Sequence, residues 1–145
     1  KTMGEEGPTD VSTGDLFGGK KVAFLGVPGA FTPGCHKTHL PSFVNNYDGI
    51  KEKGFDAIVC LAVNDIWVMD AWSTASGADG KVTMVADGSA VFTKAMGLEL
   101  DLTHVGMGMR CKRFSMVVHD GVVESINLDD RSIENTTGEN TCGLG

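Results

Sequence analysis

The chain has 145 residues, of which 41% are hydrophobic and 21% are charged, and its formal net charge is −7. This length and composition predict one globular domain and exclude a disordered chain, and no apolar run is long enough to span a membrane. The lysines and arginines are scattered, and an acidic chain without a basic stripe is a poor ligand for nucleic acids and anionic membranes.

The first half of the chain predicts two loops, two strands and two helices. Residues 1–19 are rich in glycine and acidic side chains, which indicates an entry loop. The apolar run over 21–27 predicts a strand buried on both faces, and a second apolar run over 56–63 predicts another strand. Between them, residues 28–34 form a loop and residues 35–53 a helix that Pro41 should kink and Gly54 should end. Asn64 and Asp65 can then cap a helix over 66–74.

The second half predicts a third strand over 82–86 and a helix that ends at Gly97. Residues 98–111 look irregular because they contain Gly106 and Gly108. Residues 112–119 and 122–128 then predict a hairpin around Asp120-Gly121, followed by a polar, loop-like segment over 129–145. Early parallel crossovers and a late antiparallel hairpin indicate an α/β fold with a mixed sheet and helices on both faces.

The segment Pro28-Gly-Ala-Phe-Thr-Pro-Gly-Cys35 places a cysteine in the first turn of a helix. The first N–H groups of a helix lack intrahelical partners and the helix dipole is positive there, so both favour the thiolate over the thiol. Thr32 stands three residues before the cysteine, where its hydroxyl can donate or accept a hydrogen bond near the sulfur. Pro28 and Pro33 stiffen the loop. We therefore expect Cys35 to be an activated nucleophile.

Such a thiolate suits attack on the O–O bond of a peroxide, provided that fixed donors meet the negative charge on the leaving oxygen. An arginine would serve best, because it stays charged and presents several donors. Arg113 begins a predicted strand and Arg110 lies in the loop before it. The spacing alone does not choose between them.

The same residues allow other interpretations. Cys35 can be a passive buried thiol and Thr32 a simple helix cap. Cys35, His36 and His39 could together hold a metal ion, although no further ligand is evident. The four cysteines, at 35, 60, 111 and 142, have no CxxC or zinc-like spacing. We therefore expect an intracellular, mostly reduced protein.

Residues 26–44, GVPGAFTPGCHKTHLPSFV, resemble the active-site segment of the peroxiredoxins, most closely the type II or peroxiredoxin-5-like subfamily. The resemblance continues through CLAVND (60–65), VADGSAVFTKAMGLELDL (85–102) and KRFSMVVHDGVVESINL (112–128). It implies a thioredoxin-like three-layer fold in one domain over residues 1–145, with either end open to trimming. Relatives usually begin with a β-hairpin, which residues 1–15 are not expected to form.

The resemblance also implies a thiol-dependent peroxidase that reduces hydrogen peroxide and alkyl hydroperoxides through a sulfenic acid, without a metal or cofactor. Cys35 would be the peroxidatic cysteine, with Thr32 and Pro28 as the other members of the Pro-x-x-x-Thr-x-x-Cys motif. Arg113 would be the arginine that holds the thiolate and the peroxide. Thioredoxin, glutaredoxin or glutathione would regenerate the thiol.

The resemblance offers two resolving cysteines. Cys142 resembles the C-terminal resolving cysteine of the animal peroxiredoxin-5 group, whereas Cys60 matches the position proposed in the plant type II group. Cys142 is favoured, because Cys60 lies in the middle of a strand and would need local unfolding to reach Cys35. A one-cysteine cycle with an external thiol stays open.

The expected protein is a monomer or weak homodimer of the cytoplasm or of a mitochondrion, plastid or peroxisome. An alternative of a different class is a peroxide-sensing redox relay or binding module, which uses the same thiolate with little turnover. A thiol–disulfide exchanger is disfavoured because no CxxC begins at Cys35.

Overall fold

The structure, a computed structural model, describes residues 1–129. In chain order the elements are β1 (Thr2–Gly4), β2 (Gly7–Thr9), α1 (Thr13–Phe17), β3 (Lys21–Val27), η1 (Cys35–His39), α2 (Leu40–Asn45), α3 (Tyr47–Glu52), β4 (Ala57–Ala62), α4 (Ile66–Ala75), β5 (Thr83–Ala86), α5 (Val91–Ala95), β6 (Glu99–Leu102), η2 (Thr103–Val105), β7 (Gly108–Cys111), β8 (Arg113–His119) and β9 (Val122–Asp129).

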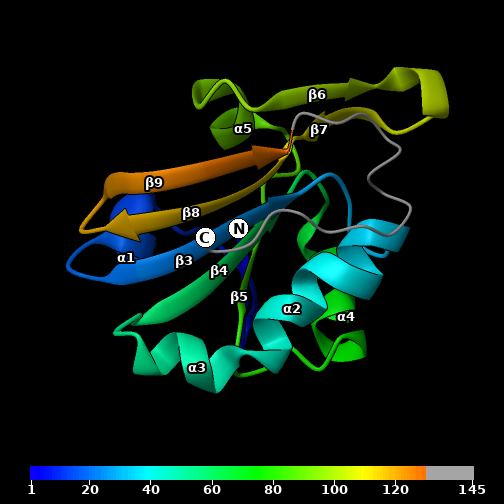
Figure 1. The fold of residues 1–145 in the computed structure, drawn as a ribbon. Coiled ribbons are helices and arrows are strands. Elements are labelled where there is room, and N and C mark those ends of the chain that lie inside the picture. The colour runs from blue at the N-terminus through cyan, green and yellow to red at the C-terminus, as the bar shows by residue number, and fades with distance from the viewer. Residues whose placement is uncertain (130–145) are drawn as a thin grey trace.

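A five-stranded sheet in the order β5-β4-β3-β8-β9 forms the centre of the molecule (Figure 1). β3, β4 and β5 are parallel, whereas β8 runs antiparallel to β3 and β9 antiparallel to β8. The predicted mixed sheet is therefore confirmed. The register places Leu25 beside Cys60 and Gly26 beside Phe114, so the end of β3 lies between β4 and β8.

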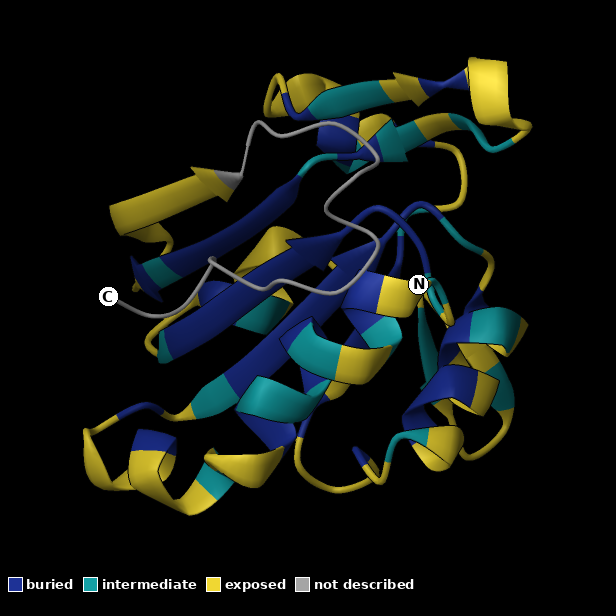
Figure 2. Cartoon of the chain, turned by 45° about the vertical axis from the view of Figure 1, so that its right-hand side comes forward, coloured by how far each residue is buried: buried dark blue, intermediate teal, exposed yellow. Residues whose placement is uncertain are grey.

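Apolar side chains fill both faces of this sheet, which explains the continuous apolar runs of β3 and β4. On one face α2 and α4 cover the strands, through residues such as Leu40, Phe43 and Trp72. On the other face α1 contributes Phe17, which packs against Phe24 at a centroid distance of 5.1 Å. Figure 2 shows the inner strands as buried and β9, at the sheet edge, as exposed. The helices on both faces complete the predicted α/β architecture.

The helix expected over 35–53 is instead three pieces. The first turn, η1, is a π-helix in which the Leu40 N–H donates to the Cys35 carbonyl five residues back. Pro41 was predicted to kink a continuous helix, but it lies in the first turn of α2, directly after this π-helix. A proline has no N–H to donate and is tolerated in the first turn of a helix, where that N–H would have no intrahelical partner. The actual break comes at Asn46, where φ is −101° and ψ is 15°. Gly54, with φ +90°, ends the segment as predicted.

Two segments expected to be loops contain strands. β1 and β2 pair as an antiparallel hairpin, and the Ala86 N–H donates to the Lys1 carbonyl over 2.8 Å, which ties this hairpin to β5. Residues 98–111 also form a hairpin, in which β6 pairs with β7. Both contain strands of only three or four residues, too short for an alternating pattern to stand out in the sequence.

Several local signals act as predicted. The Asp65 side chain caps α4 by accepting a hydrogen bond from the Val68 N–H over 2.9 Å. Gly97 follows α5 with φ +67°. Asp120 and Gly121, with φ of 48° and 78°, make the two-residue turn between β8 and β9. These signals depend only on neighbouring residues, so the sequence shows them directly.

Candidate active site

Cys35 lies just beyond the carboxyl end of β3, in the first turn of the helical segment, and is fully buried. The loop from Pro28 to Thr32 leads from the strand to this turn, and Pro28 is buried as well. The Thr32 carbonyl accepts a hydrogen bond from the His36 N–H over 2.8 Å, which anchors the turn to the loop. The sulfur is therefore held in place by backbone on both sides of the cysteine.

Arg113 meets this sulfur from the neighbouring strand. It begins β8, one residue beyond the Gly26–Phe114 pair, and its Nη2 donates to Cys35 Sγ over 3.3 Å. Only 3% of Arg113 is exposed. A guanidinium stays charged when buried, so negative charge on the sulfur is stabilised at short range with little screening by water.

Arg110, the other candidate from the sequence, donates to backbone carbonyls. Its Nε donates to the Met107 carbonyl over 2.8 Å and its Nη1 to the Val63 carbonyl over 3.1 Å. Arg110 thereby ties the β6–β7 hairpin to the end of β4. The structure thus brings Arg113 to the sulfur and directs Arg110 to backbone carbonyls, a choice that the spacing had left open.

Thr32 shapes the loop. Its Oγ1 donates to the Gly29 carbonyl over 2.7 Å, so the hydroxyl proton is directed to the loop backbone. The sequence had suggested both a donor and an acceptor near the sulfur, and this bond takes up the donor. Gly29 itself has little room: a Cβ there would lie 2.9 Å from Thr32 Cγ2 and 3.2 Å from Met107 Cε. A side chain at position 29 would crowd both the Thr32 methyl group of the same loop and the Met107 side chain, which lies between β6 and β7.

Asn64 is a further residue of the site that the sequence reasoning missed. Sequence reasoning assigned Asn64 and Asp65 together as helix caps, but only Asp65 caps α4. The Asn64 Oδ1 instead accepts a hydrogen bond from the Ala30 N–H over 3.0 Å. This side chain therefore joins the Pro28–Thr32 loop to the segment that directly follows β4. Its sequence position, directly after a buried strand, is the signal that could have suggested such a role.

The described cysteines 35, 60 and 111 are all buried free thiols. Cys60 lies in the middle of β4, and burial first, then the nearby Cys35 and Cys111, raise the pKa of its thiol well above that of a free cysteine. A thiol held in the protonated form is a poor nucleophile. Cys142, the other predicted resolving residue, lies outside the described residues.

The two histidines of the turn contact different side chains. His36 Nδ1 accepts a hydrogen bond from Trp72 Nε1 over 2.9 Å, and His39 packs edge-on against Phe43 at 5.7 Å between ring centroids. Within residues 1–129 no group of three or more His, Cys, Asp or Glu side chains is placed to hold a metal ion. Across the same part of the chain, no helix is both long enough and apolar enough to cross a membrane.

Comparisons with known proteins identify the family of the chain. A model of the Redoxin family matches residues 2–140. The chain is 42% identical over 127 residues to peroxiredoxin-2C of Oryza sativa subsp. japonica, a match that covers 88% of this chain and 78% of that protein. It is also 42% identical over 131 residues to the chloroplastic peroxiredoxin-2E of Arabidopsis thaliana, with 83% of this chain and 56% of that protein covered. The chain therefore spans little more than half the length of the Arabidopsis relative.

Solved structures are similar as well. Reduced Prx3 of Vibrio vulnificus in complex with hydrogen peroxide superposes with a TM-score of 0.85 and 43% sequence identity, over 88% of this chain and 80% of that one. Peroxiredoxin 5 of Alvinella pompejana gives a TM-score of 0.75 at 37% identity, over 80% of this chain and 75% of that one. Both solved structures are therefore similar to this chain in sequence as well as in fold.

Proposed function

The chain belongs to the Redoxin family, within it to the type II peroxiredoxins, and from this premise we propose that it is a thiol peroxidase whose peroxidatic residue is Cys35. The contact between Arg113 Nη2 and Cys35 Sγ, 3.3 Å long, carries the proposal. A buried guanidinium that donates to a buried sulfur stabilises the thiolate, which is the nucleophilic form of cysteine. A passive core thiol has no need of such a partner.

In the first step the thiolate attacks one peroxide oxygen. A sulfur–oxygen bond forms and the O–O bond breaks, so that sulfur is oxidised to sulfenic acid and the peroxide is reduced. The leaving oxygen departs as hydroxide or alkoxide and takes up a proton to become water or an alcohol. Arg113 provides a fixed positive charge for this developing anion, and such preorganised donors supply much of a catalytic rate enhancement.

Thr32 and Pro28 would shape the entrance to the sulfur. The Thr32 hydroxyl donates to the Gly29 carbonyl, and its oxygen lone pairs stay able to accept a hydrogen bond from the peroxide. Pro28 is buried in the loop that leads to Cys35, and its fixed φ stiffens that loop. Both residues act on how the peroxide is oriented rather than on the bond changes themselves.

The second step condenses the sulfenic acid with a thiol. A disulfide forms, the sulfur–oxygen bond breaks, and the hydroxyl leaves as water with the thiol proton. We favour Cys142 as the resolving thiol over Cys60, because Cys60 is rigidly placed in β4 and its thiol is held protonated. Thioredoxin, glutaredoxin or glutathione would then restore the dithiol, and an external thiol could replace the resolving cysteine altogether.

Hydrogen peroxide and alkyl hydroperoxides are the proposed substrates. The bound hydrogen peroxide in the Vibrio structure supports the first of these. We propose an intracellular, cytoplasmic or organellar location and a monomer or weak homodimer. The chloroplastic relative supports an organellar version of that location.

The test mixes the reduced protein with one equivalent of hydrogen peroxide and follows peroxide loss by stopped flow. Cys35→Ser should abolish the reaction, and Arg113→Ala should slow it by about 10²- to 10³-fold, the usual effect of removing one such donor. Cys111→Ala is the matched control, because Cys111 is buried on the opposite face of the sheet from α2, and it should react as the wild type does.

Two outcomes would redirect the proposal. Normal peroxide consumption by Cys35→Ser would refute it. With excess hydrogen peroxide, a reaction that stops after one equivalent, although thioredoxin, glutaredoxin and glutathione are each supplied, would favour the peroxide-sensing relay. Peptide mapping without reduction then shows whether Cys35 is bonded to Cys142, to Cys60 or to the external thiol.

A further inference from the structure

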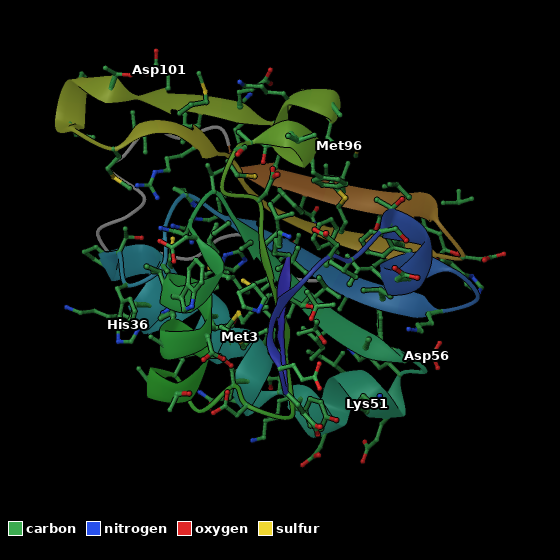
Figure 3. The ribbon with its side chains drawn as sticks, turned by 180° about the vertical axis from the view of Figure 1, so that it is seen from behind. Met3, His36, Lys51, Asp56, Met96 and Asp101 are labelled. Atoms are coloured by element: carbon green, nitrogen blue, oxygen red, sulfur yellow. The ribbon has the colours of Figure 1, made fainter. Side chains whose placement is uncertain are left out.

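His36, the residue directly after Cys35, joins the cysteine turn to helix α4. Its Nδ1 accepts a hydrogen bond from Nε1 of Trp72 over 2.9 Å, across 36 residues of sequence. In Figure 3 the labelled His36 lies where the cyan segment of the turn meets the green helix α4. Trp72 is fully buried, whereas His36 is half-buried. One side chain of this contact is therefore part of the core and the other is part of the turn that carries the nucleophile.

The buried indole makes this hydrogen bond important. A tryptophan N–H can only donate, and a buried one without an acceptor destabilises the structure. Because the N–H points at Nδ1, the neutral imidazole carries its proton on Nε2. The Phe31 ring lies beside both partners, with its centroid 5.5 Å from His36 and 6.5 Å from Trp72. Phe31 has φ of 63°, which is unusual for a residue with a side chain, so the loop is held in this conformation by its contacts.

The resolving step requires this turn to open. Cys35 is fully buried, and a second sulfur can bond to it only when the two Cβ atoms come within about 3.5–4.5 Å. The turn is closed by the backbone bonds from His36 N–H to Thr32 and from Leu40 N–H to Cys35. If residues 35–39 unwind, His36 moves away from α4 and the Trp72 N–H loses its acceptor.

We propose that the His36–Trp72 hydrogen bond is a latch that sets how often the Cys35 turn opens, which makes His36 a positioning residue for the resolving step. The proposal rests on the proposed peroxidase function, since it assigns the open turn to the reaction of the sulfenic acid with a thiol. In that reaction the S–S bond forms, the S–O bond breaks and water leaves. While the latch is closed, the sulfenate instead meets a second peroxide, which adds one oxygen to give the sulfinate and water.

The first experiment measures opening without any peroxide. The reduced protein is treated with iodoacetamide, which is bulkier than hydrogen peroxide, and the alkylation rate of Cys35 is followed by peptide mass spectrometry. His36→Ala and Trp72→Phe should each raise this rate about tenfold, which corresponds to the net loss of one hydrogen bond. His36→Asn should stay within about twofold of the wild type, because asparagine Oδ1 occupies nearly the same place as Nδ1.

Trp67→Phe is the matched control. Trp67 lies on the same helix but is 65% exposed, so its indole has no part in the latch. In this background Trp72 is the remaining tryptophan of the chain, and its fluorescence reports the environment of the latch directly. The emission should shift to the red in His36→Ala and stay in place in His36→Asn. Circular dichroism at the assay temperature checks that each variant is folded, and His36→Asn remains informative if Trp72→Phe is not.

The second experiment separates the two chemical steps. Sulfenate is formed with one equivalent of hydrogen peroxide and then resolved with glutathione. In His36→Ala the resolution rate should rise about tenfold, and the peroxide concentration that gives half-maximal sulfinate should rise by the same factor. The proposal is overturned if His36→Ala is alkylated at the wild-type rate, if His36→Asn behaves like His36→Ala, or if resolution does not accelerate with opening. If Cys35 of the wild type carries neither a sulfenate nor a disulfide after the peroxide, the peroxidase function would be refuted instead, and the alkylation result would still decide on the latch.

Discussion

At Gly26, one added methyl group should lower both the stability of the core and the rate of the reaction at Cys35. It lies on the central strand β3, directly opposite Phe114 of β8. A Cβ at this position would lie 2.0 Å from Phe114 Cε1 and 2.5 Å from Cζ, whereas ordinary van der Waals contact begins at 3.4 Å. Gly26→Ala therefore drives a methyl group into the ring, and either the ring or the strand must move.

The surroundings leave little freedom for that movement. Phe114 is fully buried and packs edge-on against Phe24 at a centroid distance of 5.1 Å. Overpacking of a core costs about 1–3 kcal/mol and occasionally more, and an overlap of this size with an enclosed ring belongs at the upper end. We expect Gly26→Ala to lower the free energy of unfolding by about 3 kcal/mol, and the melting temperature by about 10 °C for a chain of this size.

The same change should reach the chemistry. Arg113 precedes Phe114 on β8 and donates to Cys35 Sγ over 3.3 Å. If β8 moves away from β3, this contact lengthens and the reaction with hydrogen peroxide slows. A variant that loses stability but keeps the full peroxide rate would show that the ring rotates while the strand stays in place.

Urea unfolding, followed by circular dichroism, measures the stability effect. Gly49→Ala is the control, because nothing lies within 4 Å of a Cβ at that helical position. It should leave the midpoint unchanged or raise it slightly, since alanine favours a helix by about 0.5–1 kcal/mol over glycine. Phe114→Leu should cost less in the Gly26→Ala background than alone, with a coupling of at least about 1 kcal/mol. A free energy of unfolding for Gly26→Ala within about 0.5 kcal/mol of the wild-type value, the range typical of surface substitutions, would refute the reasoning.

Three further predictions concern the loop and the buried thiols. Thr32→Val keeps the shape of the side chain but removes the hydroxyl that donates to the Gly29 carbonyl. The rate of reaction with hydrogen peroxide, measured by stopped flow, should therefore fall by about fivefold or more. Thr32→Ser keeps the hydroxyl and should react at nearly the wild-type rate. Asn64→Ala leaves the Ala30 N–H without its acceptor, so it should lower the urea-derived free energy of unfolding by about 1–3 kcal/mol and also slow the peroxide reaction. A loss of stability with an unchanged rate would show that the reaction at Cys35 does not depend on this contact. Burial raises the pKa of the Cys111 thiol to about 12, from 9.0 for an unperturbed thiol. As the pH rises, the thiol therefore ionises in the unfolded chain before it does so in the folded protein. The contribution of this group to the free energy of unfolding should be fully present below pH 9 and should decline as the pH rises toward 12. Urea midpoints between pH 8 and about 10.5 should show a shallower decline in Cys111→Ala, and an equal slope in both proteins would contradict the assignment.

The sequence by itself determined the elements whose signals are local. The apolar run of β3 marks a strand buried on both faces, and Asp120-Gly121 marks the turn of the β8–β9 hairpin. Asp65 and Gly97 mark the start and end of helices. Each of these depends on a few consecutive residues and on backbone preferences that hold in any protein. For the same reason, the segment around Cys35 was visible as a cysteine in the first turn of a helix.

The tertiary structure decided which distant groups meet. The choice of Arg113 over Arg110 required the pairing of β8 with β3, because Arg113 reaches a sulfur that is 78 residues away in the sequence. The Asn64–Ala30 and Trp72–His36 contacts likewise span 34 and 36 residues. Strands as short as β1, β2, β6 and β7 also become strands only when a partner supplies their hydrogen bonds. Local patterns record the period of a helix or strand, whereas these contacts depend on how the finished elements pack in space.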